Sequence, residues 1–223
     1  LKATAWVFFG MGCTIVANYL VSVMMAFVKN LLGYELTQNN YGNSDDILTY
    51  IVMFVATAIA PAIFEEFSFR CCTLGVLKKY GKGFAVFMVS IIFGLIHGNV
   101  IQFVFAFLVG LILAYITVQT DNVIIAMFIH GLNNARSAVS DIITTAANEK
   151  LANTVSTIIM IIFVVLAIIA LIYLLYTKSF ATEKKMKSLY DNNFGTKIAC
   201  MIPGMIVPFA ILIALTKQYV TKI

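Results

Sequence analysis

Charged residues are scarce in this chain, and so are the residues that break helices. Only 11% of the 223 residues are Asp, Glu, Lys or Arg, 61% are apolar, and three are proline. With a mean hydropathy of +0.97, this composition lies outside soluble usage and is typical of an integral membrane protein. The apolar runs are continuous rather than alternating, which favours transmembrane helices over the strands of a membrane barrel.

Other features are absent as well, and each absence argues against a class of protein. The four cysteines form no Cys-x-x-Cys pair, so we expect free thiols rather than disulfides or a cysteine metal site. No internal repeat marks a secondary transporter. The net charge of +5 does not indicate nucleic-acid binding, because the lysines cluster at loop ends, where orientation and lipid headgroups account for them.

The apolar runs predict an all-α polytopic bundle of about seven transmembrane helices, within a range of six to eight. We expect one domain over residues 1–223, with its functional core at about 47–145. The predicted spans are 4–28, 47–79, 84–97, 100–118, 123–145, 151–177 and 198–216.

Two local signals refine these spans. Residues 83–120 contain no Asp, Glu, Lys or Arg, yet one helix of that length would run roughly 57 Å against a hydrocarbon core of about 30 Å. They must therefore form two spans, and Gly98-Asn99 is the best turn signal. In the second span, Pro61 leaves the carbonyl of Thr57 without its helical donor and predicts a kink.

The distribution of lysines predicts the orientation. With the N-terminus inside, nine lysines fall in cytoplasmic segments and four in outer segments. Positive residues are enriched on the cytoplasmic side of membrane proteins. We therefore expect a cytoplasmic N-terminus.

The most polar point of the apolar sequence is the stretch from Glu65 to Arg70. On a helix, Glu66 and Arg70 lie four residues apart on one face, which predicts an ion pair. Glu65 projects about 100° away and is free to meet another group. Ionisable groups at membrane depth cost about 2.5 kcal/mol or more each and usually serve a function; a structural Glu–Arg clamp at the membrane edge is the alternative.

The two histidines of the chain also fall in predicted spans. His130 and Asn134 share a helical face, and an imidazole beside a carboxamide is a donor pair suited to an oxyanion. Phe93 lies one turn before His97, where packing is its simplest role. At 1.5 Å per residue, the polar groups of the three spans, Glu65 included, fall in one band of depth.

Together these side chains supply what hydrolysis of a peptide bond by activated water requires. Glu65 is the candidate general base. His97 is placed to hold the same water or to protonate the leaving amine. His130 and Asn134 are the candidate donors to the tetrahedral oxyanion.

Three short motifs occur in order on separate predicted spans: Glu65-Glu66-x-x-x-Arg70, Phe93-x-x-x-His97 and His130-x-x-x-Asn134. They resemble the three motifs of the CAAX protease and bacteriocin-processing (Abi) family, which includes Ras-converting-enzyme-like proteases. The resemblance implies a multi-span intramembrane glutamate endopeptidase.

The same resemblance implies a role for each matched residue. Glu65 and His97 would activate water, and His130 and Asn134 would form the oxyanion hole, while Glu66, Arg70 and Phe93 would support them. One departure is Cys71, which stands where many members of the family have Gly, and which bears on helix packing rather than on the chemistry.

Two alternatives stay open. Glu65 with the two histidines is also a zinc ligand set, although no His-Glu-x-x-His is present, so we expect no metal cofactor. A non-proteolytic bacteriocin-immunity or peptide-sensing role is the second alternative. Serine-type and presenilin-like proteases fit less well, because no Gly-x-Ser-Gly or Gly-x-Gly-Asp occurs and Tyr190-Asp191 lies in a lysine-rich loop.

The expected partners are the lipid bilayer and a membrane-associated peptide or protein substrate. Prenylated CAAX tails are the eukaryotic substrates that the resemblance implies. A compact chain rich in Ile, Lys and Asn is more typical of a bacterial member of the family, which would lie in the bacterial cell membrane. There, a leader peptide, a pheromone precursor or a bacteriocin precursor is the expected substrate.

Overall fold

The computed structural model describes the whole chain except residues 33, 37–46, 182–193, 217–219 and 223. The described residues are almost entirely helical, which confirms the predicted all-α membrane fold. The structure adds one short antiparallel pair of strands, β1 (Tyr34–Leu36) and β2 (Val220–Lys222). Part of the lysine-rich loop, with Tyr190-Asp191, lies outside the described residues.

The helices follow the predicted spans within a few residues. The first is α1 (Lys2–Leu32), and α5 (Lys82–Leu95) and α6 (Val100–Thr120) form a hairpin. After them come α7 (Val123–Ala146), α8 (Glu149–Tyr176) and α9 (Phe194–Thr216). The predicted turn between α5 and α6 is confirmed: Gly98 has φ = 77°, and the side chain of Asn99 caps α6 by accepting from the backbone N–H of Gln102.

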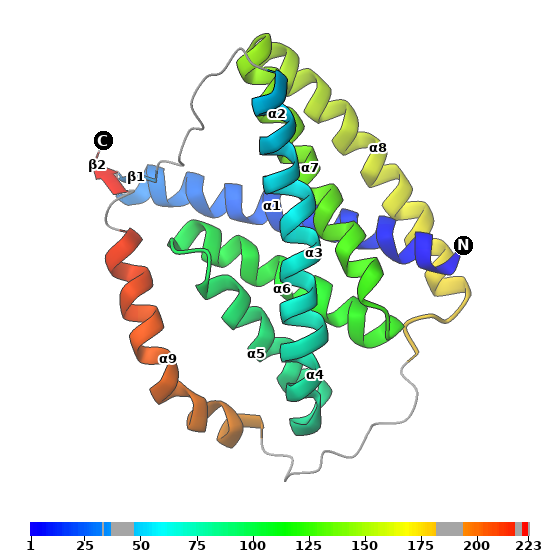
Figure 1. The fold of residues 1–223 in the computed structure, drawn as a ribbon, viewed down its shortest axis with the longest axis vertical. Coiled ribbons are helices and arrows are strands. Elements are labelled where there is room, and N and C mark those ends of the chain that lie inside the picture. Colours follow the sequence, from blue (N-terminus) through cyan, green and yellow to red (C-terminus); the bar gives the residue numbers. More distant parts are fainter. Residues whose placement is uncertain (33, 37–46, 182–193, 217–219, 223) are drawn as a thin grey trace.

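The second span is one continuous run of helix with changes of winding. It comprises α2 (Ile47–Phe54), η1 (Val55–Ile59), α3 (Ala60–Glu66), η2 (Phe67–Thr73), α4 (Leu74–Leu77) and the 3₁₀ turn η3 (Lys78–Tyr80). Segments η1 and η2 are π-helical, and η1 ends just before Pro61. Figure 1 shows α2, α3 and α4 following one another along a single column, with α7 beside it. The chain therefore accommodates Pro61 by widening the preceding turn.

The apolar core lies where α1, α6, α7 and α8 meet. Its buried side chains include Trp6 on α1, Leu113 on α6 and Ile129 on α7. A smaller cluster joins α4 to the α5–α6 hairpin through Leu74 and Val89. The larger core holds α7 in place and the smaller one holds α4. These two helices flank the polar residues of the site.

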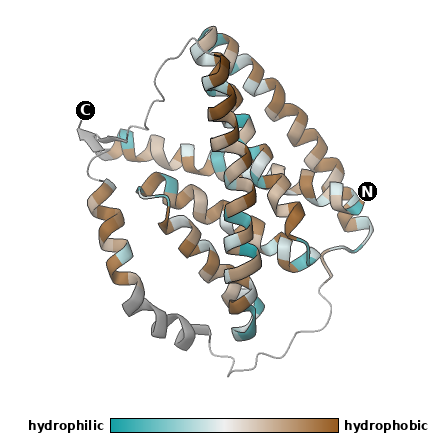
Figure 2. Cartoon of the chain, in the orientation of Figure 1, coloured by the Kyte–Doolittle hydropathy of each residue, from teal (hydrophilic) through white to brown (hydrophobic). Residues whose placement is uncertain are grey.

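Four helical segments of the described chain are long and apolar enough to cross a membrane: Lys2–Leu31, Ile47–Tyr80, Val100–Thr120 and Glu149–Tyr176. Shorter apolar helices cover Lys82–Leu95 and Met205–Thr216. Figure 2 shows hydrophobic colour over most of each helix, with hydrophilic bands that interrupt the column of α2 to α4. With α7, these elements agree with the predicted count of about seven, and the protein is an integral membrane protein.

Candidate active site

The carboxylate of Glu66 lies at the centre of the polar cluster. Its side chain is completely buried at the end of α3. One oxygen, Oε1, lies 3.0 Å from Nη1 of Arg70 and 2.8 Å from Nδ1 of His130. The ion pair predicted from the spacing of Glu66 and Arg70 is therefore present. The bond to His130 was not predicted, because nothing in the sequence shows which faces of α3 and α7 meet.

Arg70 is also buried, at 2% exposure. Besides Glu66, its guanidinium reaches the backbone carbonyl of Gly110 on α6, with Nη2 3.5 Å from the oxygen. Its Cζ lies 4.4 Å from the centre of the Phe93 ring, a cation–π distance. Arg70 thus joins α6 and the ring of Phe93 to the cluster.

Glu65 occupies a different face of the same helix, as its position predicts. Its side chain is 30% exposed, and its Oε2 lies 3.9 Å from Nε2 of His130. That distance is too long for a direct hydrogen bond. The same Oε2 is buried and has no hydrogen-bond partner. His130 therefore lies between the two carboxylates, bonded to Glu66 and facing Glu65.

The contacts of the two imidazoles define which nitrogen carries a proton. Nδ1 of His97 lies 2.8 Å from the carbonyl of Phe93, and a carbonyl only accepts. Nδ1 of His130 lies 2.8 Å from Oε1 of Glu66, the oxygen that also meets Arg70. Both Nδ1 atoms therefore donate, which leaves both Nε2 atoms available for other partners.

Phe93 has a larger role than the simple packing that its spacing suggests. Its ring is 2% exposed and meets the rings of His97 and His130 edge to face, with centroids 5.0 and 5.9 Å apart. Because Arg70 lies over the same ring, Phe93 is the common neighbour of groups from three helical segments. It links His97 to the rest of the cluster.

Asn134 is placed by a different set of contacts. Its Nδ2 donates to the backbone carbonyl of Thr57, 3.1 Å away in η1, and its Oδ1 accepts from Nδ2 of Asn133 at 3.3 Å. The contact with Asn133 was not predicted from the sequence. The structure thus gathers Glu65, Glu66, Arg70, Phe93, His97 and His130 in one cluster, with His97 joined through the ring of Phe93. Asn134 is anchored one turn beyond His130.

The described residues offer little to a metal ion. Among them, no three His, Cys, Asp or Glu side chains are grouped so that they could hold one. Glu65 and His130 face each other, but His97 reaches them through the ring of Phe93. The zinc alternative stays a prediction, and its test is chelation.

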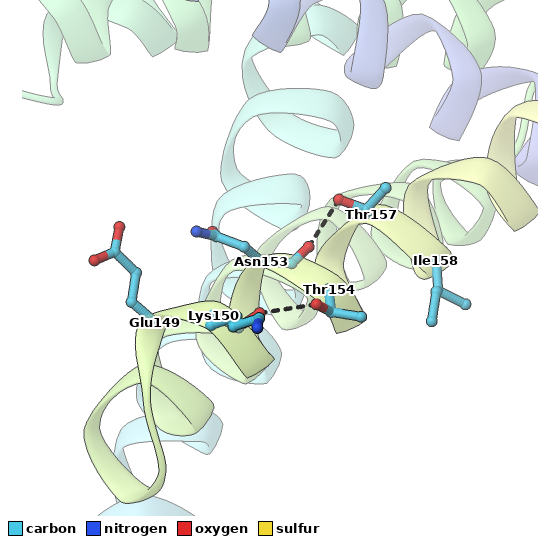
Figure 3. Close-up of a pocket in the computed structure, with 6 residues that line it drawn as sticks. All are labelled: Glu149, Lys150, Asn153, Thr154, Thr157 and Ile158. Carbon is cyan, nitrogen blue, oxygen red and sulfur yellow. Dashed lines mark hydrogen bonds between the residues drawn. The ribbon is translucent and has the colours of Figure 1, made fainter.

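A hollow of about 590 Å³ lies at the N-terminal end of α8 (Figure 3). It is lined by Glu149, Lys150, Asn153, Thr154, Thr157 and Ile158. Two of its hydroxyls bond to backbone carbonyls of their own helix. The hollow contains none of the predicted site residues, so it is not the candidate active site.

The helical membrane fold defines the class as a multi-span membrane protein, and it holds a buried Glu–Arg–His cluster. Residues 47–136 match the family described as Rce1-like, type II CAAX prenyl endopeptidase Rce1-like. The resemblance carried by the three motifs is thereby confirmed for residues 47–136, which are similar to a CAAX protease domain. No curated protein and no solved structure matched the chain.

The matched stretch runs from the start of α2 into α7 and contains every predicted site residue. It lies inside the predicted core at 47–145. The single domain over residues 1–223 stays a prediction. The match to a protease family implies, in general terms, endopeptidase activity on a peptide or protein in the membrane.

A first prediction concerns the buried ion pair. Arg70→Ala would leave the Glu66 carboxylate buried with His130 as its remaining counter-group, and breaking such a pair costs about 3–5 kcal/mol. We expect a corresponding loss in the free energy of unfolding, measured in detergent. Lys150→Met, which removes an exposed cation on α8, is the control. Equal stability of the two variants would contradict the central place given to this pair.

Proposed function

We propose that the chain is a glutamate-type intramembrane endopeptidase in which Glu65 is the general base. The observation that carries this proposal is the pair of atoms Oε2 of Glu65 and Nε2 of His130, 3.9 Å apart, with the former buried and unpartnered. An oxygen atom of water or substrate can hydrogen-bond to both across that distance. Glu65 is thus a free carboxylate beside a histidine that a second carboxylate holds in place.

The contacts of the cluster support a role for His130 as an oxyanion donor. His130 lies between the carboxylates of Glu65 and Glu66, and Arg70 lies on the far side of Glu66. When Nε2 carries a proton, it supplies an N–H that can bond an oxyanion. Glu66 holds the ring in the orientation that points Nε2 towards Glu65, because it accepts from Nδ1.

In the proposed reaction, Glu65 accepts a proton from water as the water oxygen bonds to the scissile carbonyl carbon. The carbonyl oxygen becomes an oxyanion, which His130 and Asn134 stabilise by N–H donation. The bond between carbon and nitrogen then breaks, and the leaving nitrogen takes the proton that Glu65 accepted from water, either directly or passed on through Nε2 of His97. Because Nδ1 of His97 is held by the carbonyl of Phe93, Nε2 is the atom of His97 available for this transfer.

The substrate class follows from the family and from the setting of the site. We propose a membrane-associated peptide or protein: a prenylated CAAX tail, or in a bacterial membrane a leader peptide, pheromone precursor or bacteriocin precursor. The second candidate function is non-proteolytic immunity or peptide sensing. It would not require the unpartnered carboxylate oxygen of Glu65, so the proteolytic function is preferred.

A second prediction tests the general base directly. Glu65→Gln keeps the size of the side chain but removes its basicity, and a general base contributes about 10²–10⁴ to the rate. We expect cleavage of membrane-tethered peptides, including a farnesylated CAAX peptide, to fall by that factor. The measurement is mass spectrometry of products from purified protein in liposomes.

The control for this variant is Glu149→Gln, the same change at an exposed site on α8. It should cleave like the wild type. Equal cleavage by Glu65→Gln and the wild type would remove Glu65 from the mechanism. A biological immunity function that survives Glu65→Gln would instead support the non-proteolytic alternative.

A third prediction concerns metal dependence. Because the described site does not group three ligands for a metal ion, we expect cleavage to persist after treatment with 1,10-phenanthroline and after dialysis against EDTA. Loss of cleavage that added zinc restores would establish the zinc-dependent alternative.

A fourth prediction concerns topology in a bacterial cell membrane. The lysine distribution supports a cytoplasmic N-terminus. Green fluorescent protein fused before Leu1 should therefore fluoresce, and alkaline phosphatase fused there should be inactive. The reverse pattern would overturn the proposed orientation.

A further inference from the structure

The side-chain amide of Asn134 is held at both of its polar ends. A backbone carbonyl only accepts, so the contact with Thr57 fixes Nδ2 as the end that faces η1. The donor Nδ2 of Asn133 fixes Oδ1 at the other end. One N–H of Asn134 is therefore used by Thr57, and the second N–H is available to another acceptor.

The carbonyl of Thr57 is available because of a residue four positions along the chain. In an α-helix this carbonyl would accept from the backbone N–H of residue 61, but Pro61 has none. The helix is π-wound just before it, and the N–H of Ala60 bonds to the carbonyl of Val55, five residues back. Pro61 thus removes the α-helical competitor of Asn134 for this acceptor.

A close approach of two helices lets Asn134 reach that backbone. Gly131 lies one turn before Asn134, and a Cβ added there would lie 3.3 Å from Cβ of Ala62 and 3.9 Å from the carbonyl oxygen of Ala58. Both alanines are almost fully buried, at 4% and 1% exposure. Small residues on both sides bring α7 against η1 and α3, so a side chain as short as Asn can bond to the opposite backbone.

We infer that Pro61 is a positioning residue that acts through Thr57 and Asn134. By freeing the carbonyl of Thr57, it anchors one N–H of Asn134 and leaves the second to stabilise the oxyanion. Asn133 holds the other end of the Asn134 amide by donating to its Oδ1. This inference rests on the proposed function, because it takes Asn134 as an oxyanion donor.

The fifth prediction is that Pro61→Ala slows catalysis without weakening the fold. The new N–H at residue 61 would compete for the carbonyl of Thr57 and free the amide of Asn134 to rotate. We expect kcat for the farnesylated CAAX peptide to fall about tenfold or more, up to the about 10²–10³-fold effect of deleting an oxyanion donor. KM should stay unchanged, and the melting temperature should not fall, because alanine is a better helix former than proline.

Pro208→Ala is the matched control, since it makes the same change at an exposed position of α9. It should leave kcat unchanged. In the background of Asn134→Ala, Pro61→Ala should alter kcat less than twofold, because the side chain on which it acts is missing. Additive losses in that double variant, or a normal kcat for Pro61→Ala alone, would overturn the inference.

A readout without catalysis separates this inference from the proposed function. In ¹⁵N-asparagine-labelled protein, the Asn134 amide signal, assigned by its loss in Asn134→Ala, should show one slowly exchanging N–H in the wild type. Pro61→Ala should make that proton exchange faster, while Pro208→Ala should not. An unchanged signal in Pro61→Ala would refute the positioning role. A changed signal in a protein that cleaves no peptide would refute the proposed function and leave the anchoring of Asn134 standing.

Discussion

The site depends on one carboxylate oxygen that is contacted by both a guanidinium and an imidazole. Oε1 of Glu66 meets both Arg70 and His130 in a region from which water is excluded. A buried carboxylate is costly unless it is paired and hydrogen-bonded. This requirement fixes the rotation of α7 against α3, and it sets the direction in which Nε2 of His130 points. The geometry around Glu65 follows from that constraint.

Much of this arrangement could be predicted because helical periodicity fixes which neighbours in the sequence share a face. The pairing of Glu66 with Arg70, the separate direction of Glu65 and the turn at Gly98-Asn99 all follow from local spacing. The loss of the helical donor to the Thr57 carbonyl was also predictable from Pro61. These features need no knowledge of how the helices pack.

The rest depends on contacts between helices, which no local pattern specifies. The bond from His130 to Glu66 spans 64 positions in the chain, and the ring of Phe93 meets Arg70 from a different helix. The widening of the helix into π turns at η1 and η2 also escaped prediction. That change of winding alters which side chains face α7. Beyond a π turn, the angle of 100° per residue no longer predicts correctly which face of the helix a residue occupies.

The placement of Arg70 one turn after Glu66 has a consequence for biogenesis. Both charges belong to the same helical segment, so they can enter the bilayer during synthesis as a neutral pair rather than as isolated ions. His130 is made much later and meets a pair that is already compensated. The segment can therefore insert with the charges of Glu66 and Arg70 already compensated, before the active site exists.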